Sequence, residues 1–252
     1  TRKESSAASD VYKRQLFMKR IVLAVASVMT LAGLPVVASA QLSGNVALTS
    51  NYKFRGQDQD VSKDKTVKPA LQGGFDYAFS NGFYVGNWNS SVDWLENNSL
   101  ETDVYGGFKG DLGNGLTYDV GALAYLYSGA GSANTGELYG ALTWTAFTLK
   151  YSHTVSKKYF GVEDGRHTGY LNLAYAQEIA PKLTLKAAVG YTRFSNDAKD
   201  NGAVRYFDYG VGLGYDLGEG FAVAGGLYGG NKRDSYPGVN KNRFIVTVSK
   251  TL

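Results

Sequence analysis

The sequence predicts an all-β fold, a closed antiparallel transmembrane β-barrel of about 12 strands. Three observations predict it. From residue 41 onward the chain alternates apolar and polar residues in a dozen segments, their connections are alternately tight and long, and no long apolar helix is available. Because the hydrocarbon core of a bilayer offers backbone groups no water, a chain of such strands crosses a membrane by closing into a barrel.

The front of the chain has the pattern of a secretory signal peptide. Within residues 18–40, Lys19 and Arg20 precede an apolar run over 21–34, which Pro35 breaks before the small residues 38–40. A basic start, an apolar middle and a small-residue end are typical of a cleaved signal, so a barrel domain over 41–252 is expected. The alternative is a transmembrane helix, for which the apolar run is barely long enough.

Residues 1–17 precede Met18, a plausible initiator, and lack periodicity. We interpret 1–17 as a non-native or artefactual leader, since the stretch SSAASDVYKRQ resembles translated adaptor sequence. The alternative is a genuine N-terminal extension. Segments of this kind are set aside before the fold is considered.

The charge of the barrel domain is balanced. Residues 1–40 hold six of the 26 lysines and arginines and two of the 22 acidic residues, so residues 41–252 carry 20 of each. The basic isoelectric point of about 9.0 therefore comes mostly from the front of the chain and gives no support for a nucleic-acid partner. There is no cysteine, which excludes a disulfide scaffold and cysteine-ligated metals.

The alternation predicts the strands one by one. It is clearest over 116–128, where Tyr118 and Val120 share one face and Asp119 and Tyr125 share the other. In the third strand the aromatic and polar residues also separate, and Asp93 falls on the polar face, which we assign to the lumen. The expected strands are 42–55, 66–80, 83–95, 100–112, 116–128, 136–144, 147–156, 166–179, 183–195, 203–217, 221–231 and 241–252.

The connections carry a second, independent signal. The tight ones are 81–82, 113–115, 145–146, 180–182 and 218–220, and the others are 56–65, 96–99, 129–135, 157–165, 196–202 and 232–240. Asn-Gly and glycine-flanked turns supply the positive φ that short hairpins need. Outer-membrane barrels have short periplasmic turns and longer external loops, so both termini are expected in the periplasm. The alternative, a soluble β-sandwich, does not require this strict alternation.

Charged residues on the polar faces are expected to line the lumen. Following strand direction, the set predicted at the external pore mouth is Lys53, Arg55, Lys68, Asp93, Glu101, Asp103, Glu137 and Arg243. Such a ring can orient and filter ions or polar solutes. The alternative is a salt-bridged network that merely fills the lumen. Glycines of the strand over 203–217, such as Gly210 and Gly212, either leave room in the lumen or permit curvature.

The sequence gives little support for an enzyme active site or a metal site. Of the two histidines, His153 is predicted to face outward near the external rim, with Ser152 pointing the opposite way, and His167 begins the next strand. A hydrolase needs a serine beside a histidine base, so we predict no enzyme activity and no cofactor. Loop carboxylates such as Asp58, Asp60 and Asp64 could bind Ca²⁺ weakly, but solvated loop charge is the simpler interpretation.

Two segments resemble one family. The stretches SGNVALTSNYKFRGQDQD, residues 43–60, and NGFYVGNWNSSVDW, residues 81–94, are similar to those of the TorF-type porins of Gram-negative outer membranes. The resemblance covers essentially all of 41–252 and implies a β-barrel with a channel role. It implies no substrate and no residue-level assignment.

The expected function is an outer-membrane, porin-like channel for passive diffusion of small polar solutes or ions. Its expected partners are outer-membrane lipid, lipopolysaccharide and those solutes, with no nucleic acid and an oligomeric state that the sequence leaves open. Two alternatives remain: a non-conducting structural or adhesive barrel, and an interfacial lipid-modifying enzyme.

Overall fold

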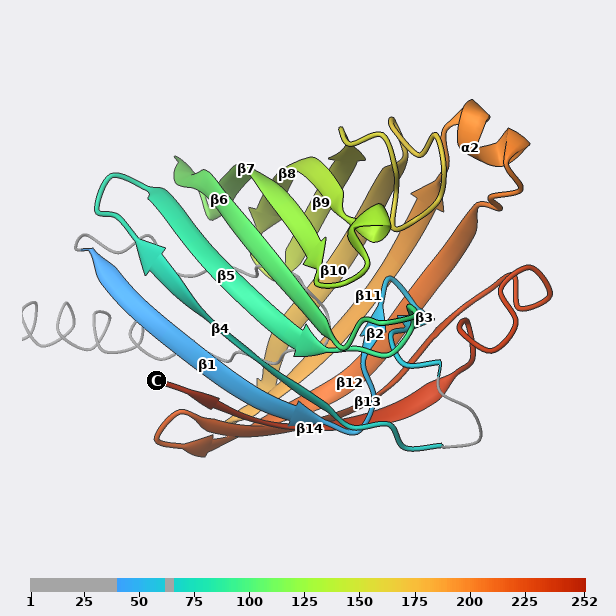
Figure 1. The fold of residues 1–252 in the computed structure, drawn as a ribbon. Coiled ribbons are helices and arrows are strands. Elements are labelled where there is room, and N and C mark those ends of the chain that lie inside the picture. The colour runs from blue at the N-terminus through green and yellow to red at the C-terminus, as the bar shows by residue number, and fades with distance from the viewer. Residues whose placement is uncertain (1–39, 62–65) are drawn as a thin grey trace, which may run out of the picture.

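A computed structural model describes residues 40–61 and 66–252 (Figure 1). The predicted signal peptide, the 1–17 leader and Asp64 lie outside the described residues. The wall consists of β1 (Gln41–Thr49), β4 (Ala70–Ala78), β5 (Phe83–Ser91), β6 (Leu100–Gly113), β7 (Leu116–Tyr127), β8 (Thr135–Trp144), β9 (Phe147–Thr154), β10 (Gly169–Ala180), β11 (Leu183–Arg193), β12 (Tyr206–Gly218), β13 (Phe221–Gly230) and β14 (Arg243–Thr251).

These twelve strands form one closed antiparallel barrel, which confirms the predicted fold class. Each wall strand pairs with the next along the chain, and β1 closes the ring against β14, with Val46 opposite Lys250. The tight connections have the backbone that their residues predict: Gly113, Asn114 and Gly115 take φ values of 87°, 54° and 77°. The tight-turn end and the long-loop end of the barrel are therefore distinct (Figure 1).

The two faces of the wall have opposite chemistry. On β12 the large apolar side chains point outward, with Val211 50% and Leu213 45% exposed, and the same holds for Val120 and Leu126 on β7. Inward positions are polar or small, such as Thr49 and Gln72, each almost fully buried. An apolar outside around a polar inside is the pattern that a bilayer imposes on a barrel.

The prediction that the first strand runs to residue 55 is wrong. β1 ends at Thr49, and the chain then turns into the ring as β2 (Lys53–Phe54) and β3 (Gln57–Asp58), a two-stranded hairpin inside the barrel (Figure 1). The predicted strand cannot continue through 55, because Arg55 and Gly56 take φ values of 47° and 77°, as in a type I′ turn, and reverse the chain so that β2 pairs with β3. We call residues 53–58 the inner hairpin.

The lumen assignment of Asp93 is also wrong. On β5 the inward face carries Tyr84, Trp88 and Ser90, followed by Val92 just past the strand, whereas the Asp93 side chain is exposed. Tyr52, leading into the inner hairpin, packs edge-to-face on Trp88 with the ring centroids 5.6 Å apart. The aromatic face of this strand therefore turns inward, because the inserted chain gives it an apolar surface to pack on.

Inward glycines are covered by tyrosine rings on the neighbouring strand. Gly210 lies directly opposite Tyr228 on β13, and a Cβ on this glycine would meet the Tyr228 ring at 2.5 Å. Gly121 and Tyr139 form the same kind of pair between β7 and β8. At these positions the glycine accommodates a ring that lies flat along the wall, which differs from both predictions, open room or curvature alone.

The long loops carry two short helical turns, η1 (Gly131–Ala133) and α2 (Asn196–Asp200). Ser195 caps α2, with its Oγ accepting a hydrogen bond from the Ala198 backbone at 3.1 Å. Within the part of the chain that the structure describes, no helix is long and apolar enough to cross a membrane.

Candidate functional site

The inner hairpin is tied to the barrel wall by a buried ion pair. Arg55 Nη1 and Nη2 donate to the two carboxylate oxygens of Glu137 on β8, at 2.8 and 2.7 Å. The side chains are 5% and 2% exposed. Arg55 Nη1 also donates to Tyr159 Oη at 3.0 Å. A two-bond arginine–carboxylate contact fixes both position and orientation, so it places the hairpin tip firmly beside β8.

Aromatic rings surround the same guanidinium. The Arg55 Cζ atom lies 4.2 Å from the ring centroid of Tyr170 on β10 and 4.8 Å from that of Phe54. Rings attract a cation through their negative faces, more strongly where water is excluded. Arg55 therefore bridges two wall strands and its own hairpin from a place inside the lumen.

Asp58 provides a second anchor at the other end of the hairpin. Its carboxylate lies 2.8 Å from Lys53 Nζ and accepts from Arg243 Nε of β14 at 2.6 Å. Lys53 Nζ also donates to the carbonyl oxygens of Gly56 and Val239 at 2.8 Å. Burial lowers the pKa of Lys53 from its ordinary value, against the opposing attraction of Asp58.

Lys68 makes a third ion pair, with Asp60, inside the segment that joins β3 to β4. Its Nζ donates to the Asp60 carbonyl at 2.8 Å and lies 3.6 Å from the Asp60 carboxylate. Lys68 is buried and precedes β4, so it braces the chain where that chain leaves the lumen.

Two carboxylates of the predicted set stand apart from these ion pairs. Glu101 and Asp103 on β6 are both fully buried and face inward. Glu101 Oε1 accepts a hydrogen bond from Tyr52 Oη at 3.2 Å. The Asp103 carboxylate has no hydrogen-bond partner among residues 40–61 and 66–252. Both side chains belong to the wall that faces the inserted chain.

The structure thus divides the eight predicted pore-mouth residues into three groups. Five are in ion pairs that hold the inserted chain: Lys53, Arg55, Lys68, Glu137 and Arg243. Glu101 and Asp103 are buried on the wall, and Asp93 is exposed and makes backbone hydrogen bonds to Gln59 and Val61.

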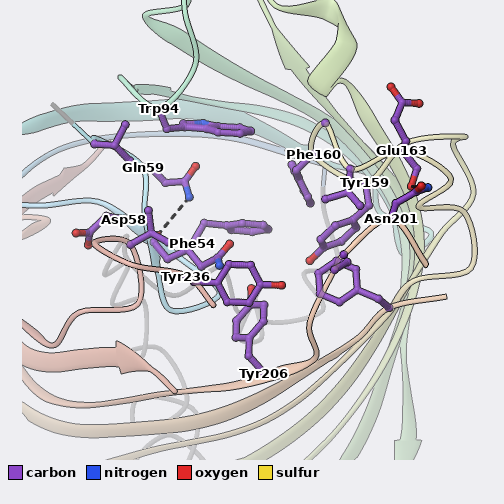
Figure 2. Close-up of a pocket in the computed structure, with 18 residues that line it drawn as sticks. Phe54, Asp58, Gln59, Trp94, Tyr159, Phe160, Glu163, Asn201, Tyr206 and Tyr236 are labelled. Atoms are coloured by element: carbon purple, nitrogen blue, oxygen red, sulfur yellow. Dashed lines mark hydrogen bonds between the residues drawn. The ribbon is translucent and has the colours of Figure 1, made fainter. Parts of the chain in front are cut away.

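A cavity of about 700 Å³ lies between the inner hairpin and the long loops. We call it the vestibule. Figure 2 shows aromatic side chains around it from several parts of the chain. Its aromatic lining consists of Phe54, Trp94, Tyr159, Phe160, Phe194, Tyr206 and Tyr236, and amides come from Gln57, Gln59 and Asn201.

Most of the aromatic vestibule residues were missed from the sequence. They lie in long loops or at strand ends, where alternation gives no information about direction. Tyr159, Phe160 and Tyr236 are aromatic residues in otherwise polar connections, and that is the signal that could have identified them. Tyr159 stacks edge-to-face on Phe194 with centroids 5.4 Å apart, so separate loops share one aromatic cluster.

The two histidines meet on the outside of the barrel. His153 Nε2 lies 3.1 Å from His167 Nδ1, and His153 Nδ1 lies 3.2 Å from Tyr151 Oη. Ser152 is buried on the opposite face of β9, as its place in the alternation predicts. Because Ser152 lies on the far side of the wall, it and His153 do not form the serine–histidine arrangement that acyl transfer needs.

The loop carboxylates do not gather into a cation site in the described segments, where no three histidine or acidic side chains come together as metal ligands. Asp58 is occupied by two basic side chains, and Asp60 lies beside Lys68. The predicted third member of this set, Asp64, lies outside the described residues.

The fold is shared with solved porins. A KdgM porin superposes with a TM-score of 0.55 at 12% identity, over 82% of this chain and 98% of that one. A NanC porin superposes with a TM-score of 0.56 at 12% identity, over 84% and 100%. At this identity the likeness establishes the fold alone. No curated protein matches this chain.

The sequence itself identifies a family. A family model described as a bacterial protein of unknown function, Gcw_chp, matches residues 36–252, which include every wall strand. The chain is therefore a member of the Gcw_chp family.

Proposed function

We propose that the protein is an outer-membrane, porin-like channel through which small polar solutes or ions diffuse passively. The apolar outer face of the wall fits lipid, and the polar inner face fits water. The KdgM and NanC porins superpose on this barrel over nearly their whole length. Within the Gcw_chp family, the motifs at 43–60 and 81–94 support the narrower assignment to the TorF-type porins.

One observation carries the proposal. A charged hairpin is inserted into the ring and is held there by the buried pair of Arg55 and Glu137. Fixed charges at a narrowing of a polar lumen are the means by which a channel selects among ions and polar solutes. Lys53, Arg55, Lys68, Glu101, Asp103, Glu137 and Arg243 are the residues that we propose to set this selectivity.

The solute class follows by analogy with the structural neighbours. A KdgM porin has been solved in complex with disordered oligogalacturonate, so a barrel of this fold accommodates a short saccharide. We propose polar solutes of comparable size for this chain. Diffusion requires no chemical step of the protein, and Ser152 lies on the opposite face of the wall from the histidine pair, so we propose no enzyme activity.

The location follows from the same proposal. Residues 18–40 would direct export and be removed, 1–17 would not belong to the mature protein, and 41–252 would insert into the outer membrane of a Gram-negative cell. The tight-turn end would then face the periplasm. Lipid would contact the outer apolar belt, and lipopolysaccharide would contact exposed basic residues at the long-loop end, such as Arg166 and Arg193.

Single-channel recording in planar bilayers tests the channel. We expect discrete conductance steps, and Arg55→Glu should shift the reversal potential in a salt gradient towards cation preference. The matched control is Arg193→Glu, at the exposed rim, which should leave the preference nearly unchanged. A folded, heat-modifiable barrel that never conducts would refute the channel and favour a sealed structural or adhesive barrel.

A further inference from the structure

The charges in the vestibule lining are already partnered. Its two carboxylates are Asp58, which is paired with Lys53 and Arg243, and Glu163, which is paired with Lys158. Among the residues that the structure describes, no lysine or arginine lines it. An anionic ligand would lose its hydration here without gaining a counter-charge, and such a loss is costly. A cationic ligand would have to displace an existing basic partner. The lining therefore suits an uncharged ligand.

The remaining lining has two kinds of group. Aromatic rings lie around the cavity: Phe54 and Tyr159 each pack edge-to-face on Phe160, and Trp94, Tyr206 and Tyr236 lie at other parts of its wall (Figure 2). Amide side chains of Gln57, Gln59 and Asn201 supply donors and acceptors. The electron-rich face of a ring attracts weakly positive C–H groups, and amides bond to hydroxyl groups. A pyranose ring offers both, with C–H groups on its faces and hydroxyls around its edge.

The size and position of the cavity agree with a ligand of this kind. A volume of about 700 Å³ lies within the range of roughly 300–1,000 Å³ that small-molecule sites occupy. The vestibule lies on the long-loop side of the inner hairpin, whose Phe54, Gln57 and Asp58 form part of its lining. A solute that enters from the long loops would meet these rings before it meets the ion pairs.

We propose that the vestibule is a binding site for a neutral oligosaccharide, which it captures ahead of the inner hairpin. The inference rests on the proposed channel function and names its substrate class. The aromatic rings hold the faces of the sugar rings, and the amides orient the hydroxyl groups. The basic side chains beside Asp58 are already engaged by it and by backbone carbonyl oxygens, so they offer a carboxylated sugar no free counter-charge, and uncharged sugars are preferred.

The test uses the full chain, exported and purified from membranes in detergent. Maltotriose and cellotriose are the neutral probes, a trisaccharide of glucuronate is the charged probe, and benzyl alcohol is the aromatic probe. Binding is measured by titration calorimetry. We expect at least one neutral trisaccharide to bind, and roughly tenfold tighter than the charged one.

Two variants make the measurement specific. Phe160→Leu removes a ring from the vestibule and should weaken trisaccharide binding by roughly tenfold. Phe147→Leu removes an exposed ring from the outer face near the tight-turn end and should leave binding unchanged. Heat-modifiable migration of both variants would establish that the barrels are folded.

Several results would overturn the inference: no binding of either neutral trisaccharide, equal or tighter binding of the charged probe, binding of benzyl alcohol alone, or no loss in Phe160→Leu. Conductance separates this inference from the channel proposal. A barrel that conducts but binds no neutral sugar refutes only the vestibule site. A barrel that binds the sugar but never conducts supports the site and refutes the channel.

Discussion

The barrel wall and the inner hairpin are held in place by different kinds of interaction. In the wall, each strand is held by the next strand along the chain, and its side chains alternate between lipid-type and lumen-type surroundings. The hairpin has only two residues in each strand and is held by partners distant in sequence, such as Arg55 with Glu137 and Asp58 with Arg243. The wall follows from the alternation of neighbouring residues along each strand, whereas the hairpin is held in place by ion pairs across the lumen.

This difference indicates where the molecule can change without unfolding. Loss of a wall contact weakens a continuous ladder of backbone hydrogen bonds, whereas loss of an ion pair releases a separate segment inside a ring that stays closed. Variants in the two regions should therefore separate stability of the barrel from occupation of its lumen.

The largest effect is expected from Glu137→Leu, which leaves the Arg55 guanidinium buried without its carboxylate. Breaking one side of a buried pair costs about 3–5 kcal/mol, and here that cost acts on the seating of the hairpin. We expect protease cleavage within 50–61 under native conditions, larger conductance, and unchanged heat-modifiable migration. The double variant Arg55→Met with Glu137→Leu should restore protection, and persistent cleavage in it would contradict the ion-pair explanation.

A smaller effect is expected from Asp58→Asn, because both of its cations keep backbone acceptors. Hydrogen bonds to charged groups contribute about 1.5–3 kcal/mol. Hydrogen exchange should become faster in the 53–58 backbone and stay unchanged in the wall. Asp234→Asn, at an exposed loop position, is the control. Faster exchange in both variants would mean that the anchor is not specific.

In the wall, Gly121→Ala tests the glycine–tyrosine pairs. A Cβ at Gly121 would lie 2.5 Å from Tyr139 Oη and 2.6 Å from the Gly106 carbonyl oxygen. Overpacking of this kind costs about 1–3 kcal/mol. The midpoint of urea unfolding should fall, whereas Gly140→Ala, whose Cβ would meet nothing closer than 3.9 Å, should be nearly neutral. Equal midpoints for the two variants would remove the proposed role of the tyrosine ring.

The smallest effect is expected from His153→Ala on the outer rim. Its contacts to His167 and Tyr151 are exposed, and exposed substitutions usually change stability by about 0.5 kcal/mol or less. Conductance and unfolding should match those of the unchanged protein. Loss of a lipid-modifying activity in this variant, measured on extracted lipopolysaccharide, would instead support the alternative that the protein is an interfacial lipid-modifying enzyme.

The sequence by itself determined the wall. Residues such as Val120 and Asp119, or Val211 and Gly212, take opposite faces because a strand repeats every two residues, and tight turns follow from local positive-φ chemistry. These are properties of neighbours in the chain, so twelve strands and their order could be predicted without any knowledge of the fold.

Only the tertiary structure decided what fills the ring. Lys53 and Arg55 continue the alternation of β1, yet they leave the wall. Lys53 pairs with Asp58 inside the hairpin, but the wall residues that hold the hairpin, Glu137 and Arg243, come into place only when the barrel closes. The vestibule depends likewise on aromatic residues from separate loops that meet only in space. Alternation fixes the direction of a side chain within a strand, but a contact between residues 82 positions apart, as between Arg55 and Glu137, depends on the closed ring.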